Sequence, residues 1–313
     1  MRVGIVGAGI AGLACAQALT GQGHDVVLLD KGRGPGGRMS TRRMETPHGT
    51  AYFDHGAQYF TLRDKDFRSQ VDVWIAEGVV APWPAAAPDA YVGVPAMNAP
   101  VKDLASRQVV RWATRVTAIQ EFGEGWRLHA DVGEAVDVDL AVLAVPAEQA
   151  GALLDRAAAD VAARADAARS DPCWAVMAAF PEPLASAADC LRGDGVLGWA
   201  ARNNAKPGRS ELESWVVQAT PDWSRLHIDD DPVDVSAALI DELSHDLGVD
   251  LPPRIGVAAH LWRFARSQPG GTGPIFEADR RLGLCGDWLI GPRVECAWLS
   301  GMRLADRIAS SRR

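Results

Sequence analysis

Three glycines near the start of the chain have the spacing of a dinucleotide-binding turn. Gly7, Gly9 and Gly12 follow a short apolar run, and a helical pattern comes directly after them. The first glycine permits a tight turn, the second lets the backbone approach a pyrophosphate, and the third lets helix and strand pack closely. The N-terminus of the helix that follows then offers backbone N–H groups and the positive end of its dipole to phosphates.

An acidic residue and a second glycine–arginine segment extend this motif. Asp30 ends the next apolar run, at the distance from Gly12 where a carboxylate accepts hydrogen bonds from a ribose. The segment 31–40 follows and reads KGRGPGGRMS. The chain has a net charge of −8, so a bound diphosphate needs local positive charge, and Arg33 and Arg38 are the nearest candidates.

A glycine–acid pair also lies near the C-terminus. The apolar run 282–284 leads into Gly286 and Asp287, and the segment RVECAWLSG at 293–301 then begins a final helical pattern. An aspartate after a strand is often only a helix cap, and that alternative stays open for Asp287.

Together these motifs resemble the flavoprotein amine oxidase superfamily, whose members follow the acidic residue with a Gly-Gly-Arg segment. The resemblance implies that Gly36, Gly37 and Arg38 wrap the diphosphate of FAD and that Asp287 binds the flavin ribityl chain. The N-terminus of the final helix then faces the flavin O2 carbonyl, where negative charge builds on reduction. No cysteine motif for covalent attachment precedes the Gly-Asp pair, so we expect noncovalent FAD.

A longer set of motifs resembles the renalase family, especially its bacterial members. They are GGRMSTRR at 36–43, AYFDHGAQYFT at 51–61, DPCWAV at 171–176, GWAARNNAKPGR at 198–209, WVVQATPDWS at 215–224 and HLWRFAR at 260–266. The resemblance implies an oxidase of dihydronicotinamides reduced at the wrong ring position, the 2- and 6-dihydro isomers of NAD(P)H. Hydride passes to flavin N5, NAD(P)+ leaves, and O2 reoxidises the flavin to give hydrogen peroxide. Such chemistry needs stacking geometry and a dry pocket, which fits the absence of a nucleophile–base motif.

The resemblance and the motif positions give a set of expected site residues. Expected cofactor contacts are Gly7, Gly9, Ile10, Ala11, Gly12, Asp30, Lys31, Arg33, Gly37, Arg38, Met39, Gly56, Ala57, Gln58, Val116 (through its backbone, at the adenine), Gly286, Asp287, Val294, Glu295 and Ala297. Expected catalytic or substrate contacts are Gln58, Tyr59, Trp199, Asn203, His260 and Trp262.

The expected substrate contacts have distinct roles and plain alternatives. Trp199 and Trp262 would form apolar walls, and Asn203 would hydrogen-bond the carboxamide. Arg202 or Arg266 would meet a substrate phosphate. A buried tryptophan is usually core and a loop arginine is usually solvated, and His260 could instead be a core histidine that anchors the sheet.

Two departures from the family pattern are visible. Cys296 stands where bacterial relatives generally carry glycine, which puts a thiol beside the expected pyrimidine edge of the flavin. Ser267 and Gln268 stand where relatives often have proline after Ala-Arg, and the geometry of that loop stays open.

The elements that must position these residues switch between strand and helix periods. Strands are expected at 2–6, 25–29, 109–119 and 140–145, and helices at 13–21 and 150–168. We expect an α/β fold in which a Rossmann-like FAD-binding domain is interleaved with a mixed-sheet α+β substrate domain, an architecture of the amine oxidase or p-hydroxybenzoate hydroxylase type. The FAD-binding domain takes 1–60, 109–149 and 276–313, and the substrate domain takes 61–108 and 150–275.

Composition and charge argue against other classes. The 313-residue chain is 48% hydrophobic and 23% charged, and its acidic balance gives no electrostatic support to nucleic acid or a membrane as partner. Its five cysteines form no CxxC pair and its seven histidines no zinc-like cluster, so we expect no metal and a reducing, cytoplasmic location. The expected partners are a small dihydronicotinamide substrate and O2, and the oligomeric state is left open.

Two other functions stay open. An amine oxidase or desaturase acting on a small hydrophobic substrate would need an aromatic sandwich before the flavin. With three tyrosines in the chain, Trp199 and Trp262 would have to form it. A non-catalytic flavin-binding redox protein is disfavoured because no sensing domain or interaction tail is visible.

Overall fold

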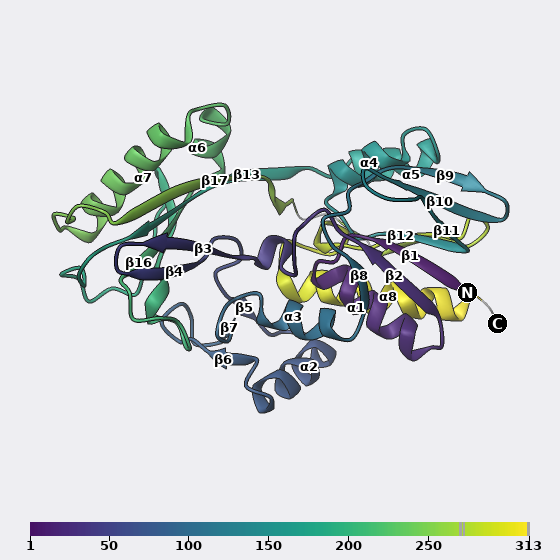
Figure 1. The fold of residues 1–313 in the computed structure, drawn as a ribbon, viewed down its shortest axis with the longest axis horizontal. Coiled ribbons are helices and arrows are strands. Elements are labelled where there is room, and N and C mark those ends of the chain that lie inside the picture. Colours follow the sequence, from purple (N-terminus) through teal and green to yellow (C-terminus); the bar gives the residue numbers. More distant parts are fainter. Residues whose placement is uncertain (269–270, 272, 312–313) are drawn as a thin grey trace. The chain divides into compact units, whose positions relative to one another are not determined.

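The computed structural model describes residues 1–268, 271 and 273–311, and the chain divides into two compact units that are each discontinuous in sequence (Figure 1). Unit 1 comprises Met1–Gly37, Pro100–Ser170 and Ser267–Arg313, and unit 2 comprises Arg38–Ala99 and Asp171–Arg266. This differs from the expected boundaries: 38–60 belongs to unit 2, whereas 100–108, 150–170 and the described residues from Ser267 to 275 belong to unit 1. Positions 269–270 and 272, within the expected stretch 150–275, lie outside the described residues.

Unit 1 is built on a six-stranded sheet in the order β18-β19-β12-β1-β2-β8. Its strands are β1 (Arg2–Val6), β2 (Asp25–Leu29), β8 (Val109–Arg111), β12 (Leu140–Leu143), β18 (Ile275–Glu277) and β19 (Leu282–Leu284). All neighbours are parallel except β18 and β19. The central strands are apolar and buried, as parallel strands covered on both faces require. With helix α1 at Ile10–Gly21 between β1 and β2, the predicted βαβ unit is confirmed.

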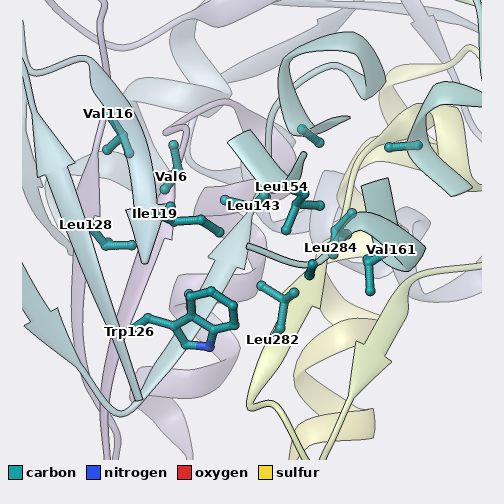
Figure 2. Close-up of a cluster of buried hydrophobic side chains, with 14 of the residues drawn as sticks. Val6, Val116, Ile119, Trp126, Leu128, Leu143, Leu154, Val161, Leu282 and Leu284 are labelled. Atoms are coloured by element: carbon teal, nitrogen blue, oxygen red, sulfur yellow. The ribbon is translucent and has the colours of Figure 1, made fainter. Parts of the chain in front are cut away.

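Helices cover one face of this sheet and a second sheet covers the other. Helix α8 (Val294–Ser310) crosses α1 closely, because Gly301 has no side chain and an added Cβ would lie 2.1 Å from the carbonyl oxygen of Ala11. The opposite face packs on the antiparallel sheet β11-β10-β9 and on two helices. These elements are β9 (Val116–Phe122), β10 (Gly125–Ala130), β11 (Val136–Val138), α4 (Ala147–Leu154) and α5 (Ala159–Asp166). Figure 2 shows the apolar core between these layers, which includes Val6, Val116, Ile119, Trp126, Leu128, Leu143, Leu154, Val161, Leu282 and Leu284.

Two predictions for unit 1 were wrong because the chain turns where one element was expected. The expected strand 109–119 is split into β8 and β9 by a turn in which Ala113 has a φ of 52°. Strand β8 pairs with β2 and β9 pairs with β10, so one segment serves two sheets. The expected helix 150–168 is also split, and α5 folds back until the carboxylate of Asp166 meets the backbone of Gly151.

Unit 2 is built on a five-stranded sheet in the order β14-β15-β16-β13-β17. Its strands are β13 (Ser170–Ala179), β14 (Cys190–Arg192), β15 (Leu197–Arg202), β16 (Ser214–Ala219) and β17 (Gly256–Ser267). One face packs on helix α7 (Pro232–Leu247), and the other on the hairpin of β3 (Thr41–Thr46) and β4 (Gly49–Asp54). Because strand side chains alternate, Val217 reaches the α7 core whereas Val216 reaches the hairpin.

The remaining elements complete the two units. They are α2 (Lys65–Ala76), α3 (Ala99–Ser106), α6 (Pro221–Leu226), the sheet of β5 (Phe60–Thr61), β7 (Ala90–Gly93) and β6 (Val80–Pro82), and the 3₁₀ turns η1 (Gly37–Met39), η2 (Asn203–Ala205) and η3 (Asp287–Leu289). Across the part of the chain that is described, no helix has both the length and the apolar character needed to cross a bilayer.

Candidate functional site

The glycine turn of unit 1 has the geometry of a phosphate-binding backbone. Gly7 has a φ of +101°, and an added Cβ there would lie 2.5 Å from the carbonyl oxygen of Ala144. Gly12 is equally closed, since its Cβ would lie 2.1 Å from the carbonyl oxygen of Gly7. An added Cβ at Gly9, in contrast, meets no heavy atom within 4 Å. The outer two glycines therefore serve the fold, and the middle one leaves room for a ligand.

The N-terminus of α1 lies beside this open space. Gly9 is the N-cap, no described side chain caps the helix, and the first turn holds no acidic residue. The backbone N–H groups of Ile10, Ala11 and Gly12 thus suit an anion. Gly37 extends the same cradle, because its φ of +54° would bring an added Cβ to 3.6 Å from the Cα of Gly9.

Asp30 ties the end of β2 to the glycine turn. Its Oδ2 accepts a hydrogen bond from the N–H of Ala8 at 2.6 Å, and its Oδ1 accepts one from the N–H of Gly32 at 2.6 Å. Each carboxylate oxygen can accept a further bond, so contact with a ribose hydroxyl is compatible with these two. Lys31 lies apart from the turn, with Nζ at 3.4 Å from Oε1 of Gln149, and burial lowers the pKa of its ammonium from the ordinary value. Arg33 is exposed.

Asp287 follows β19 in the same unit and is 5% exposed. Its Oδ2 accepts a hydrogen bond of 2.9 Å from the hydroxyl of Ser267, and the N–H of Gly286 donates to the hydroxyl of Ser300 at 3.0 Å. The N-cap of η3 is Gly286, and Asp287 is the first residue of that turn. Ser267, a departure from the family pattern, therefore holds the carboxylate of Asp287 in place.

The first turn of α8 carries a small charged cluster. Arg293 is the N-cap, and its guanidinium lies 3.4 Å from Oε2 of Glu295 and 3.3 Å from Sγ of Cys296. Cys296 is buried, and its thiol contacts this guanidinium. The N–H of Ala297 donates to the carbonyl of Arg293 within the helix, which leaves the N–H of Val294 among the free donors of the helix end.

In unit 2, the segment His55–Tyr59 crosses the sheet on the face opposite α7, and we call it the strap. The side chain of Gln218 in β16 donates to the carbonyl of Gly56 at 2.7 Å. The indole of Trp262 in β17 donates to the carbonyl of His55 at 2.8 Å. Main-chain carbonyls of the strap are therefore bound by two strands of the sheet.

The Gly-Gly-Arg segment meets the strap through the backbone of Arg38. The N–H of Ala57 donates to the carbonyl of Arg38 at 2.8 Å, and a Cβ on Gly56 would lie 2.0 Å from the same oxygen. Met39 is buried beside it, and Nη1 of Arg38 lies 3.4 Å from the carbonyl of Ala265. Glycine is thus required at position 56 because the two backbone segments approach closely, and this glycine is part of the sequence motif at 51–61.

A buried ionic cluster fixes the start of the strap. Lys206 and Arg209 both pair with Oδ2 of Asp54, at 3.4 and 2.5 Å, and all three side chains are nearly or fully buried. Burial alone would raise the pKa of Asp54, but the two cations outweigh it and hold that pKa at about 2. Burial lowers the pKa of Lys206 to about 8 against the pull of Asp54.

The cluster also uses two side chains that were expected in the substrate pocket. Gln58 donates to the carbonyl of Asp54 and accepts from Lys206 at 3.0 Å, so its amide faces into the cluster. Asn203 is 1% exposed, donates to the carbonyl of Tyr52 at 2.7 Å and accepts from the N–H of Asp54 at 3.2 Å. The amide of Asn203 is thus bound within unit 2 by backbone groups and by Lys206, and its expected carboxamide contact stays a prediction.

The prediction that Arg202 meets a substrate phosphate is wrong. Arg202 lies three positions after Trp199 in β15, so strand alternation points it to the opposite face. There it lies over the ring of Trp215 and pairs with Glu213 at 3.2 Å. Arg266, the other candidate, is exposed.

Aromatic rings gather at the β17 side of the strap. The ring of His55 lies 5.2 Å from that of His260 and 5.1 Å from that of Trp262, centroid to centroid. Burial, reinforced by His260, lowers the pKa of His55 to about 4, and burial with nearby Arg42 lowers the pKa of His260. Both imidazoles are therefore neutral at neutral pH. His260 lies in this ring cluster, as its expected pocket role requires.

Trp199 lies at the other side of the strap, in register with Gln218 on the neighbouring strand. Its ring is 5.4 Å from that of Tyr59, the last residue of the strap. The side chains of Trp262, Gln218 and Trp199 thus meet one continuous segment on one face of the sheet.

Sequence reasoning missed Asp54, Lys206, Arg209 and Gln218. All four stand in motifs quoted for the resemblance, but nothing local marks their roles, since their partners lie up to 163 residues away in the chain. Among the described residues, no three His, Cys, Asp or Glu side chains are placed to hold a metal ion.

Family comparisons decide between the classes that this geometry allows. A model of the NAD(P)-binding Rossmann-like domain matches residues 5–72, and a model of flavin containing amine oxidoreductases matches residues 72–309. The chain belongs to the flavin-containing amine oxidoreductases. The cofactor is FAD, for which the dinucleotide turn, the open space at Gly9 and the uncapped end of α1 are suited.

Individual relatives agree with this placement. An L-amino-acid oxidase from Demansia vestigiata is 52% identical over 44 residues, which are 14% of this chain and 8% of that protein. A hydroxyneurosporene desaturase from Rubrivivax gelatinosus is 45% identical over 62 residues, 20% of this chain and 11% of that protein. The chain thus matches only about a tenth of the length of these curated relatives.

Solved structures match the whole fold at low identity. A protein named as a protoporphyrinogen oxidase from Exiguobacterium sp. 255-15 has a TM-score of 0.76 at 12% identity, with 99% of both chains covered. Cyclohexylamine oxidase from Brevibacterium oxydans IH-35A has a TM-score of 0.69 at 14% identity, again over 99% of both chains. At these identities the likeness confirms the expected α/β architecture and nothing finer.

Proposed function

We propose that this flavoenzyme oxidises the 2- and 6-dihydro isomers of NAD(P)H. In balance, one dihydronicotinamide, one proton and O2 give NAD(P)+ and hydrogen peroxide. Bound FAD, held without a covalent link, supplies the acceptor for the hydride and returns the electron pair to O2. The five free cysteines support a reducing, cytoplasmic location as part of the proposal.

The observation that carries the proposal is the neutral aromatic cluster of His55, His260 and Trp262. Loss of a hydride leaves positive charge on the nicotinamide ring. Aromatic faces stabilise such a cation, and imidazoles kept neutral by burial do not repel it. The family motifs in the strap and in β15–β17 support the same reaction class.

The other residues of the face would position the ring rather than exchange protons with it. Gln218 and Trp262 donate hydrogen bonds to carbonyls of the strap, and the Asp54 cluster fixes the residue that precedes it. A fixed strap presents a fixed surface to a flat ring, and hydride transfer depends on that distance and alignment.

Amine oxidation is the second candidate, and family membership favours it. The aromatic residues Trp199, Tyr59 and Trp262 would then enclose a small hydrophobic amine. Such an amine must lose its proton before oxidation, and the neutral imidazoles of His55 and His260 are groups in this cluster that could accept one.

Anaerobic stopped-flow absorbance at the flavin band separates these candidates. The holoenzyme is mixed with 2- or 6-dihydro-NAD(P), with ordinary 4-dihydro-NADH as the control, and in parallel with a panel of primary amines and amino acids. The proposal expects rapid bleaching by the misreduced isomers alone. Bleaching by an amine and by none of the isomers would replace it with the second candidate.

A further inference from the structure

One arginine on the strap face of unit 2 is held in place but has no anionic partner among the residues that the structure describes. Arg192 ends β14 and lies in register with Trp199 on β15. Its guanidinium carbon lies 4.5 Å from the centroid of the Trp199 ring and 5.7 Å from that of Tyr59. Its Nη2 donates to the hydroxyl of Tyr59 at 3.0 Å and to the carbonyl of Ala86 at 3.0 Å.

The charge of Arg192 is not neutralised within the described chain. Arg202 and Arg209 in the same unit each pair with a buried carboxylate. Across residues 1–268, 271 and 273–311, Arg192 has no ion-pair partner, and its Nε and Nη1 donate to no protein acceptor. It is also exposed, in a chain of net charge −8. A cation fixed by two aromatic rings, with unused donors, is prepared to bind an anion.

The strap face therefore differs chemically between its two sides. Toward β17 it presents Trp262 and the neutral imidazoles of His55 and His260. Toward β14 it presents an aromatic platform, Trp199 and Tyr59, that ends in the guanidinium of Arg192. This order matches a ligand with a flat ring that becomes cationic, which would lie toward β17, and with phosphate groups, which would lie toward β14.

We propose that Arg192, with Trp199 and Tyr59, forms the subsite that binds the diphosphate of a dihydronicotinamide dinucleotide. This rests on the proposed function and adds a specificity residue to it. Arg192 contributes its remaining N–H donors to the phosphate oxygens, and the aromatic platform keeps the guanidinium oriented. The subsite distinguishes the dinucleotide from the corresponding riboside, which carries the same ring but no phosphate.

Isothermal titration of the holoenzyme tests this without requiring turnover. NAD+ and nicotinamide riboside are titrated into wild type, Arg192→Gln and Arg192→Lys. We expect Arg192→Gln to weaken NAD+ binding about tenfold or more while riboside binding changes less than about twofold. Arg192→Lys should fall between, because the ammonium keeps the charge but not the planar stacking. In Arg192→Gln the affinity for NAD+ should also depend less on salt concentration than in wild type.

Arg263→Gln is the matched control, since Arg263 is an exposed arginine of the same unit that lies 3.9 Å from Asp229. Equal losses for both ligands would make Arg192 a packing residue and overturn the subsite. If wild type does not bind NAD+, the subsite is also overturned. The same holds if Arg192→Gln weakens the binding of benzoate but leaves NAD+ binding unchanged, and Arg192 would then belong to a carboxylate site. If NAD+ binds as expected but the dihydro isomers do not bleach the flavin, the proposed reaction fails while the phosphate subsite stands.

Discussion

The candidate sites of the two units are built from different parts of the chain. In unit 1 the candidate site is formed by the backbone. It consists of Gly9 with open space beside it, the uncapped N–H groups of α1 and a turn that Asp30 closes. In unit 2 the site consists of side chains whose directions depend on strand register and on partners far away in sequence. Backbone sites leave a pattern that can be read from spacing, whereas side-chain sites reveal themselves only when the fold pairs the strands.

The largest expected effect separates a ligand role from a folding role at the glycine turn. Gly9→Leu should abolish FAD retention, because its side chain would fill the space where the pyrophosphate approaches. Gly21→Leu is the control, since a Cβ at Gly21 also meets no heavy atom within 4 Å. The ratio of flavin to protein absorbance measures both. A fully flavinylated Gly9→Leu protein would show that the phosphates bind elsewhere.

The next effect tests whether unit 2 depends on its buried charges. Asp54→Asn leaves Lys206 and Arg209 buried with less compensation and should destabilise the fold by about 3–5 kcal/mol. Urea unfolding followed by far-UV circular dichroism gives the value. Asp137→Asn, the same change at the exposed pair with Arg127, should leave the midpoint unchanged within error. If the two variants behave alike, the buried cluster contributes nothing that a surface pair does not.

A pH experiment addresses the neutral imidazole of His55. Its folded pKa of about 4 lies below the ordinary 6.5, so between these values the unfolded chain binds a proton that the folded chain does not. Stability therefore rises with pH across this window and falls, by about 1–3 kcal/mol, on acidification from 6.5 to 4. Asp54 and Lys206, with pKa values of about 2 and about 8, titrate outside it.

His55→Gln should reduce this acid loss, and His260, whose pKa is also lowered, should account for what remains. Unfolding free energies measured at pH values of about 4.5 and about 7 give the slope for each variant. An unchanged slope in His55→Gln would mean that the imidazole of His55 is charged in the folded protein.

The smallest effect concerns Cys296 in unit 1. Cys296→Gly restores the residue expected from relatives, and should keep FAD but lower stability by about 1 kcal/mol through helix propensity and the lost contact with Arg293. Ala297→Gly in the same turn changes propensity without removing a thiol. A difference between the two variants isolates the thiol–guanidinium contact, and loss of FAD from Cys296→Gly alone would give the thiol a cofactor role.

Much of unit 1 could be predicted from sequence because its motifs are local. The βαβ unit and its glycine turn lie within the first 30 residues of the chain, and the apolar strand expected at 140–145 is present as β12 (Leu140–Leu143). The interrupted elements could not be predicted, since Ala113 adopts a positive φ that no glycine or proline announces.

Unit 2 shows where spacing alone fails. Trp199 and Arg202 stand three residues apart, and strand β15 continues to Arg202, so the two side chains lie on opposite faces of the sheet. Gln58 and Asn203 are amides that suit a ligand equally well, and only the distant Asp54 and Lys206 show that they are already used. The residues 38–60 were assigned by sequence neighbourhood, whereas β3 and β4 pack on the unit 2 sheet.

The order of strands in unit 1 has a consequence for how the protein is made. The middle pair of its sheet joins β1 to β12, and the next pair joins β12 to β19, so in both pairs the neighbouring strands are separated by more than a hundred residues of chain. Strand β1 leaves the ribosome well before β12 and β19, so it must wait for both of them before this sheet is complete. We therefore expect nascent chains that end before β19 to expose apolar strand surface and to depend on chaperones until the final helix is released.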